Sequence, residues 1–333
     1  METRIESLVP EELIAKIRAT FPSCRLGRWP TPLVVAPALA AEVGAAALWM
    51  KLEAASSPRY GGSKVRGLEF LLADAPPDAV FVTIGGTGST HCLATATHAR
   101  AIGRRCALAQ FPQPRTTAAA ALARAAVAAA DVVERCDTRV GFPLAVLRAW
   151  RGARRRGTPR WIPGGGAHPH AVLGHILAGL ELAGQLPHAP DAIVTPFGSS
   201  GTAAGLVLAM RLLRWPTTVI GVRVAPALMA NRFRVAHLAR AAERVLTRVP
   251  LRMPPPAAAL SLALINGLGR GYGYPTAAGE EASRTAGRHG FTLDPTYTAK
   301  AFAVLPHLRE RGYRRIVFWH TFAPPPDPAE PVA

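Results

Sequence analysis

One lysine of this chain is placed where its amine could react with a carbonyl group. Lys64 follows the small-residue segment 60–63, and the apolar stripe of residues 65–72 predicts a helix with Ser63 as N-cap and Lys64 in the first turn. The helix dipole disfavours a cation there and lowers the pKa of an amine toward its neutral, nucleophilic form. The alternative is an exposed lysine at a helix end. Because the chain has only four lysines, each one is informative.

A second candidate is a turn of small residues, which comprises Gly198, Ser199, Ser200, Gly201 and Thr202. Small residues expose backbone N–H groups, and the hydroxyls would lie at the positive end of the next helix, so the turn could bind a phosphate. The alternative is a tight turn that binds nothing, and the turn alone does not decide between them. Neither a G-x-G-x-x-G pattern nor a P-loop is present, which disfavours NAD and ATP.

Further hydroxyl and aromatic groups follow other glycine-rich turns. Ser89, Thr90 and His91 come after the glycines at 85–88 and could hold a carboxylate at a helix start, although the pattern is not that of a nucleophile elbow. The tyrosines at 272, 274 and 297 lie close together in sequence, where core packing is the ordinary explanation. The histidines at 168, 170 and 175 have few carboxylate or thiol neighbours, so no metal site is expected.

Two segments with the same pattern must position these groups. Residues 79–111 and 192–224 each read as a strand, a small-residue turn, a helix and a second strand, which predicts βαβ units in a parallel sheet and an α/β fold. The alanine-rich residues 116–133 predict a helix, whereas residues 136–163 read as an irregular connection. A domain boundary is expected near residue 160.

The composition limits the class of protein. The chain has 333 residues, 49% of them hydrophobic and 18% charged, which is typical of a globular protein with a sizeable core. The net charge of +18 comes from arginines spread along the chain without interleaved aromatic residues, so a solvated basic surface is favoured over a nucleic-acid site. Four dispersed cysteines predict neither zinc nor disulfides and fit the cytoplasm. Residues 192–210 are too interrupted for a membrane span.

Taken in order, several segments resemble one family, the fold type II pyridoxal-phosphate enzymes that include 1-aminocyclopropane-1-carboxylate deaminase and D-cysteine desulfhydrase. The segments, between residues 30 and 321, are LWMKLEAASSPRYGGSKVRGLEFLLADA, VTIGGTGSTH, WIPGGGAHPHAVLGHILAGLELAG, IVTPFGSSGTAAGL, GYGYPTAAGEEA, LDPTYTAKAFAVL and VFWHT. The resemblance implies two open, mostly parallel sheets flanked by helices, with the cofactor in the cleft between a large domain (1–54 and 161–333) and a small one (55–160). It also implies a homodimer.

The resemblance assigns roles to the candidate residues. It implies that Lys64 bonds covalently to the aldehyde of pyridoxal 5'-phosphate and then acts as the base, and that the turn at 198–202 holds the phosphate. It makes Ser89, Tyr297 and Tyr272 catalytic, with Tyr274 as an alternative to Tyr272. The remaining assignments are cofactor binding by Thr90, Thr298 and Thr321 and substrate binding by Ser89, Thr90 and His91.

Two positions distinguish the activities within this family. The resembling deaminases carry Glu after the D-P-x-Y tyrosine and Leu after the late histidine, whereas this chain has Thr298 and Thr321. These two threonines favour elimination from a small amino acid such as D-cysteine, which gives pyruvate, ammonia and sulfide. A specialised β-elimination or β-substitution is the other form that this activity could take. The first alternative is 1-aminocyclopropane-1-carboxylate deamination. Departures from the family pattern at Gly88, Thr90 and Phe322 motivate a second, a degraded homologue that binds cofactor or amino acid without turnover.

Overall fold

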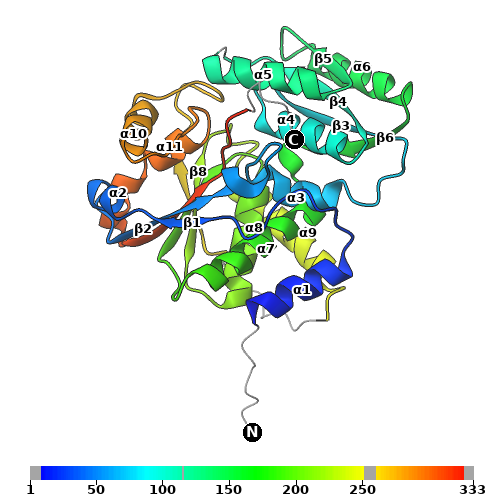
Figure 1. Ribbon diagram of the computed structural model, residues 1–333. Coiled ribbons are helices and arrows are strands. Elements are labelled where there is room, and N and C mark those ends of the chain that lie inside the picture. The colour runs from blue at the N-terminus through cyan, green and yellow to red at the C-terminus, as the bar shows by residue number, and fades with distance from the viewer. Residues whose placement is uncertain (1–8, 115, 251–259, 326–333) are drawn as a thin grey trace.

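The computed structural model describes residues 9–114, 116–250 and 260–325 and contains two separate sheets (Figure 1). The six-stranded sheet has the order β1-β2-β10-β7-β8-β9, and the four-stranded sheet has the order β5-β4-β3-β6. All neighbouring strands pair in parallel except β1 and β2, which are antiparallel. The strands of the larger sheet are β1 (Leu33–Val35), β2 (Ala47–Leu52), β7 (Ala192–Phe197), β8 (Thr218–Arg223), β9 (Leu262–Asn266) and β10 (Arg315–His320). The strands of the smaller sheet are β3 (Ala79–Gly86), β4 (Arg105–Phe111), β5 (Val132–Arg135) and β6 (Thr158–Ile162).

Helices cover both faces of the larger sheet because its strands are apolar on both sides. In β10, Val317 and Trp319 pack into one hydrophobic core and Ile316 and Phe318 into the other, as the period of two along a strand requires. The first face is covered by α1 (Pro10–Thr20), α7 (Pro169–Gln185), α8 (Gly201–Leu213) and α9 (Arg232–Leu246). The second face is covered by α2 (Pro37–Glu42), α10 (Ala277–Arg288) and α11 (Thr298–Phe302).

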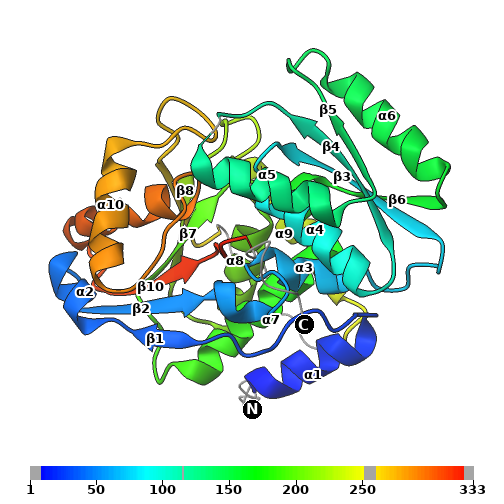
Figure 2. The ribbon, with the colours of Figure 1, turned by 45° about the horizontal axis from the view of Figure 1, so that its top comes forward.

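The smaller sheet is also covered on both faces (Figure 2). On one side lie α3 (Lys64–Leu71), α4 (Thr90–Ala101) and α5 (Thr117–Ala129), and on the other lies α6 (Phe142–Arg154). Short 3₁₀ turns are η1 (Glu53–Ser56), η2 (Gly164–Gly166), η3 (Leu305–His307) and η4 (Arg309–Arg311). The two predicted βαβ units are therefore present as β3-α4-β4 and β7-α8-β8, and the α/β class is confirmed.

One predicted element was wrong. Residues 136–163, expected to be irregular, contain α6 and β6. The buried residues of α6 are Ala145, Ala149 and Ala153, spaced four residues apart, and most of the intervening positions carry large or charged residues. Alanines at this spacing give a weak apolar signal, although they pack closely against the sheet. The strand β6 belongs to the smaller sheet and ends at residue 162. The division into two domains near residue 160 stays a prediction.

Candidate active site

The carboxyl ends of parallel strands from both sheets open into one cavity of about 380 Å³. Its wall includes the ends of β3 and β7 and the residues that follow β8 and β10. In open α/β sheets, ligands bind at this edge, where helices begin and loops diverge. The cavity is lined from both sheet layers, so it lies in the cleft between them.

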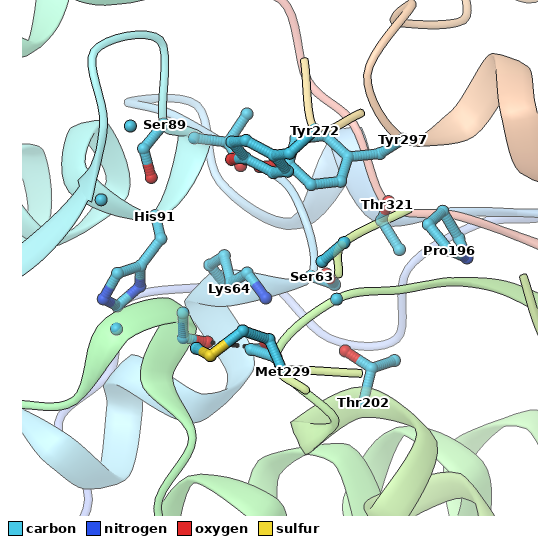
Figure 3. A pocket seen from close by; sticks show the side chains of 18 of the residues that line it. Ser63, Lys64, Ser89, His91, Pro196, Thr202, Met229, Tyr272, Tyr297 and Thr321 are labelled. Atoms are coloured by element: carbon cyan, nitrogen blue, oxygen red, sulfur yellow. Dashed lines mark hydrogen bonds between the residues drawn. The ribbon is translucent and has the colours of Figure 1, made fainter. Parts of the chain in front are cut away.

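Lys64 projects into this cavity from the start of α3 (Figure 3). The predicted helix start is confirmed, but Ser63 makes no side-chain capping bond; its N–H instead donates to the carbonyl of Thr321, at 3.2 Å. The preceding backbone is tightly packed, since a Cβ on Gly61 would lie 1.8 Å from the Ala54 carbonyl oxygen. Gly62 has a φ of 103°, which favours glycine.

Burial changes the protonation of the Lys64 amine. Removal from water lowers its pKa from 10.5 to about 8. The sequence predicted this direction from the helix dipole, whereas in the structure desolvation is the cause. About a tenth of the amine is therefore neutral at pH 7, which is the form that attacks an aldehyde.

The turn at 198–202 fits a phosphate group. Ser200 has a φ of 74°, an uncommon backbone conformation for a residue other than glycine, and its buried Oγ has no hydrogen-bond partner among the described residues. The turn leads directly into α8, whose first N–H groups lack acceptors within the helix. The hydroxyl of Ser199 donates to the Gly165 carbonyl at 3.1 Å, which ties the turn to η2. Gly198, Ser199, Ser200 and Thr202 line the cavity, and Gly201 does not.

Ser89, Thr90 and His91 lie on the cavity wall at the start of α4. Ser89 is the N-cap, and its hydroxyl accepts a hydrogen bond from the Cys92 N–H at 3.3 Å. The Thr83 hydroxyl lies 2.9 Å from the Ile162 carbonyl oxygen and 2.9 Å from His91 Nε2, and so it links the imidazole to the end of β6.

His91 Nδ1 is buried and has no hydrogen-bond partner among the described residues. Burial and the nearby charge of Lys64 lower the pKa of His91 to about 3. The imidazole is therefore neutral at physiological pH.

The two tyrosines assigned to catalysis meet in the cavity. The hydroxyls of Tyr272 and Tyr297 hydrogen-bond to each other, and both rings line the wall (Figure 3). Burial raises the pKa of Tyr272 to about 12 and that of Tyr297 well above its usual value. Tyr274 is exposed, lies beside Arg270 and does not line the cavity, so the structure brings Tyr272 to the site.

The two threonines that distinguish the activities have different surroundings. Thr321 lines the cavity, as does Phe322. Thr298 is fully buried and does not line it; its hydroxyl donates to the Asp294 carboxylate at 2.7 Å. At position 88, a Cβ would lie 2.7 Å from Ala119, so the packing of α5 explains why glycine replaces a larger residue there.

The sequence analysis missed several residues of the wall. Asp294 was within a motif already noticed, and its carboxylate accepts hydrogen bonds from the backbone N–H groups of residues 296–298. The others carried no local signal because their neighbours in space are distant in sequence. They are Tyr60, Phe111, Arg139, Phe142, Met229 and Arg234.

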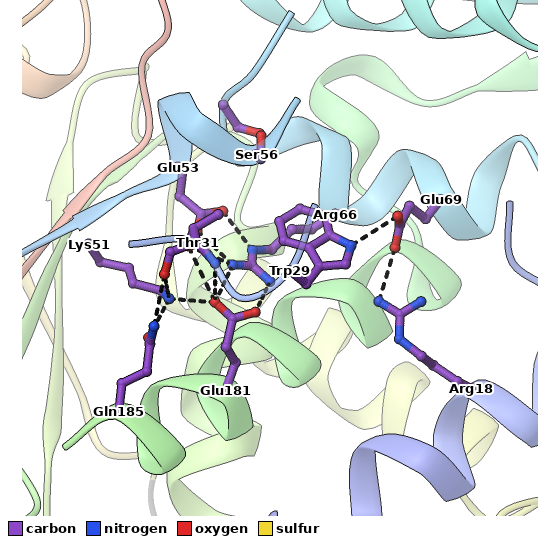
Figure 4. Close-up of polar contacts among 11 residues, drawn as sticks. Arg18, Trp29, Thr31, Lys51, Glu53, Ser56, Arg66, Glu69, Glu181 and Gln185 are labelled. Atoms are coloured by element: carbon purple, nitrogen blue, oxygen red, sulfur yellow. Dashed lines mark hydrogen bonds and ion pairs between the residues drawn. The ribbon is translucent and has the colours of Figure 1, made fainter. Parts of the chain in front are cut away.

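A buried ion-pair network outside the cavity wall holds α3 (Figure 4). The Arg66 guanidinium donates to both oxygens of Glu53, at 2.6 and 2.8 Å, and to both oxygens of Glu181, at 3.0 Å each. Lys51 pairs with Glu181 and donates to the Thr31 carbonyl at 2.8 Å. The charges of two cations and two carboxylates cancel in this network. Arg66 follows Lys64 by two residues on the same helix. The network therefore anchors the helix that presents the reactive amine.

The described residues contain neither a membrane-spanning helix nor a cluster of metal ligands. No helix there is long and apolar enough to cross a bilayer. No three His, Cys, Asp or Glu side chains of residues 9–114, 116–250 and 260–325 come together in a way that could hold a metal ion. The rings of His168 and His170 stack at 5.3 Å between centroids, and His175 is buried between α7 and α8.

A partly neutral lysine in one cavity with a phosphate-type turn, in a cleft between two parallel sheets, defines an enzyme that uses a phosphorylated aldehyde. A family model described as "Pyridoxal-phosphate dependent enzyme" matches residues 24–321. The chain belongs to this family of pyridoxal-phosphate dependent enzymes, with pyridoxal 5'-phosphate as cofactor.

Individual relatives agree with this assignment. The chain is 30% identical over 313 residues to a Pyrococcus horikoshii protein described as "Putative 1-aminocyclopropane-1-carboxylate deaminase", with 92% of this chain and 94% of that protein covered. The crystal structure of an "ACC deaminase homologue" has a TM-score of 0.79 at 28% identity and covers 92% of this chain and 94% of its own. Threonine deaminase isoform 2 from Solanum lycopersicum, at 17% identity, covers 96% of this chain and 85% of its own with a TM-score of 0.62, which shows the shared fold.

Proposed function

We propose that this protein is a pyridoxal-phosphate dependent lyase that eliminates a β-substituent from a small amino acid, with D-cysteine as the model substrate. The residues of the cavity suit each part of the cofactor. The turn at 198–202 would hold the phosphate, the amine of Lys64 would bond to the aldehyde, and Thr90 and Thr321 would contact the ring. When bound, pyridoxal phosphate withdraws electrons from the substrate Cα and weakens its bonds.

The state of the Lys64 amine is the observation that carries this proposal. The amine is held in the cavity with a pKa of about 8, so it can lose its proton near neutral pH and accept one from the substrate Cα. His91 and Tyr272 lie in the same cavity, but His91, with a pKa of about 3, is a very weak base, and Tyr272, with a pKa of about 12, keeps its proton at pH 7. The amine is therefore the group best suited to accept a proton there.

The neighbouring hydroxyls would orient the substrate and supply protons. Ser89, at the start of α4, would bind the substrate carboxylate together with the backbone N–H groups of that helix turn. Because the hydroxyls of Tyr272 and Tyr297 share a hydrogen bond, one of the pair still has a proton to donate toward the cavity.

The choice between elimination and ring opening rests on the acids near the site. Among the described residues that line the cavity, Asp294 is the only carboxylate, and its oxygens are taken by backbone N–H groups and the Thr298 hydroxyl. Position 298, where the resembling deaminases carry a carboxylate, holds a threonine that does not line the cavity and whose hydroxyl donates to Asp294, so it adds no acid to the site. This supports elimination.

1-Aminocyclopropane-1-carboxylate deamination is the alternative activity. It is supported by the printed descriptions of the relatives and by the meeting of Ser89 with the two tyrosines in one cavity. A cofactor-binding homologue without turnover remains a third candidate because Phe322 adds bulk to the wall. We also propose the large and small domains defined above, a homodimer and a cytoplasmic location.

Product analysis separates these activities. D-cysteine and water would give pyruvate, ammonia and sulfide, whereas 1-aminocyclopropane-1-carboxylate and water would give 2-oxobutyrate and ammonia. We expect the purified protein to be yellow and to release sulfide from D-cysteine, and we expect Lys64→Ala to lose both properties. Exclusive formation of 2-oxobutyrate would establish the alternative, and a yellow protein that forms no product from D- and L-amino acids would establish the degraded homologue.

A further inference from the structure

Two arginines line the cavity from opposite sides of the cleft. Arg139 lies in the connection between β5 and α6, beside the smaller sheet, and Arg234 lies in the first turn of α9, beside the larger one. The segment that carries Arg234 also contributes Met229, which lies below Lys64 in Figure 3. Both arginines thus belong to segments that reach the site.

Neither guanidinium is neutralised within the described part of the chain. Arg66, by comparison, is buried and pairs with two carboxylates. Half-buried Arg234 and exposed Arg139 form no ion pair with any described carboxylate, and the buried Nε of Arg234 has no hydrogen-bond partner among the described residues. Asp294, the one carboxylate among the described residues of the wall, already accepts hydrogen bonds from its own loop.

Unpaired cations at a partly closed site favour an anionic ligand. Arginine forms strong, often bidentate hydrogen bonds to carboxylate and phosphate groups, and the low-dielectric wall of a cleft strengthens them. In the proposed function, Ser89 and the backbone N–H groups at the start of α4 already bind the α-carboxylate of the substrate. The charge of the two arginines therefore calls for a second anionic group on the ligand.

We propose that Arg139 and Arg234 select amino-acid substrates whose side chain carries an anionic group, such as a carboxylate, sulfonate or phosphate. This inference rests on the proposed function, because it assumes that an amino acid binds in the cavity. It deepens that function by naming the substrate class. The two arginines act on specificity, and the proton transfers remain with Lys64 and the hydroxyl groups.

A pair of unreactive probes tests the selection. We would compare 2-amino-3-phosphonopropionate with 2-aminobutyrate, each as both enantiomers, on the holoenzyme. Binding would be measured by the change in cofactor absorbance and by the rise in the thermal unfolding midpoint, neither of which requires turnover. We expect the phosphonate to bind at least tenfold more tightly, and this preference to fall at high salt because screening weakens the ionic contacts.

The variant Arg139→Gln/Arg234→Gln should reduce the ratio of the two affinities at least tenfold. Its matched control is Arg148→Gln/Arg240→Gln, which removes the same charge from exposed positions of α6 and α9 outside the cavity and should keep the preference. Equal affinity for the two probes in the wild type would overturn the inference. An equal loss of preference in the control variant would also overturn the inference. The inference would fail as well if the main defect of the cavity variant were release of the cofactor.

The outcome also separates this inference from the proposed function. Binding of 2-aminobutyrate without preference for the phosphonate refutes only the selection by the arginines. If neither probe changes the cofactor absorbance and no amino acid is converted, then both the proposed function and this inference fail.

Discussion

Removal of Arg66 should destabilise the protein strongly, because this residue neutralises two buried carboxylates at once. Arg66→Met would leave Glu53, which is fully buried, with only the Thr31 hydroxyl as a side-chain donor. It would also take two hydrogen bonds from Glu181, which keeps Lys51. Breaking a buried pair in this way costs about 3–5 kcal/mol. This is a large part of the roughly 5–15 kcal/mol that stabilises a typical domain.

A second substitution measures the energetic coupling between Arg66 and Glu53. In Arg66→Met/Glu53→Met, the remaining Lys51 and Glu181 still balance each other, and Thr31 can donate to Glu181 at 3.3 Å. The double variant should therefore be more stable than the sum of the two single changes predicts, by about 1–3 kcal/mol.

Urea unfolding of the holoenzyme, followed by tryptophan fluorescence and by cofactor absorbance, measures these costs. Arg18→Met is the control, since Arg18 pairs with Glu69 at 3.2 Å while remaining about a third exposed; its loss should cost about 0–1 kcal/mol. If Arg66→Met does not fold, recovery of the folded double variant still tests the coupling. A cost below about 1 kcal/mol for Arg66→Met, or strict additivity in the double variant, would refute the reasoning.

Three further predictions concern the cavity. The rate at which the apo-protein captures pyridoxal phosphate should rise with pH through about 8, as the Lys64 amine loses its proton; a midpoint near 10.5 in stopped-flow absorbance would contradict the burial argument. Buried Lys300 donates to the carbonyls of residues 268 and 271, at 2.9 and 3.3 Å, and so holds the loop before Tyr272. Lys300→Met should therefore lower the free energy of unfolding, measured in urea, by about 1–3 kcal/mol and should also slow turnover. Tyr272→Phe should lower the rate of product formation at least tenfold, whereas Tyr274→Phe should change it less than twofold; equal effects would show that Tyr272 has no special role.

The sequence by itself determined the fold class and the places of two candidate groups at helix starts. Short apolar strands followed by small-residue turns and helices indicate βαβ units because each signal is local. The lysine at 64 and the turn at 198–202 stand out for the same reason, since their neighbours in the chain define the helix starts that carry them. Both groups lie on the wall of one cavity.

Only the tertiary structure decided what depends on contacts between distant residues. Tyr272 and Tyr274 are two positions apart, yet one lines the cavity and the other is exposed, because the loop path is set by packing against Phe111 and Tyr297. The Thr298 hydroxyl is taken by its own loop, which the motif does not reveal.

The arginines show the same limit most clearly. A chain this rich in arginine gives no local sign of which ones are paired. Arg66 meets Glu181 across 115 residues of sequence, whereas Arg139 and Arg234 reach the cavity without a described carboxylate partner. Local patterns encode secondary structure, but the burial and pairing of a charge depend on which segments the fold brings together.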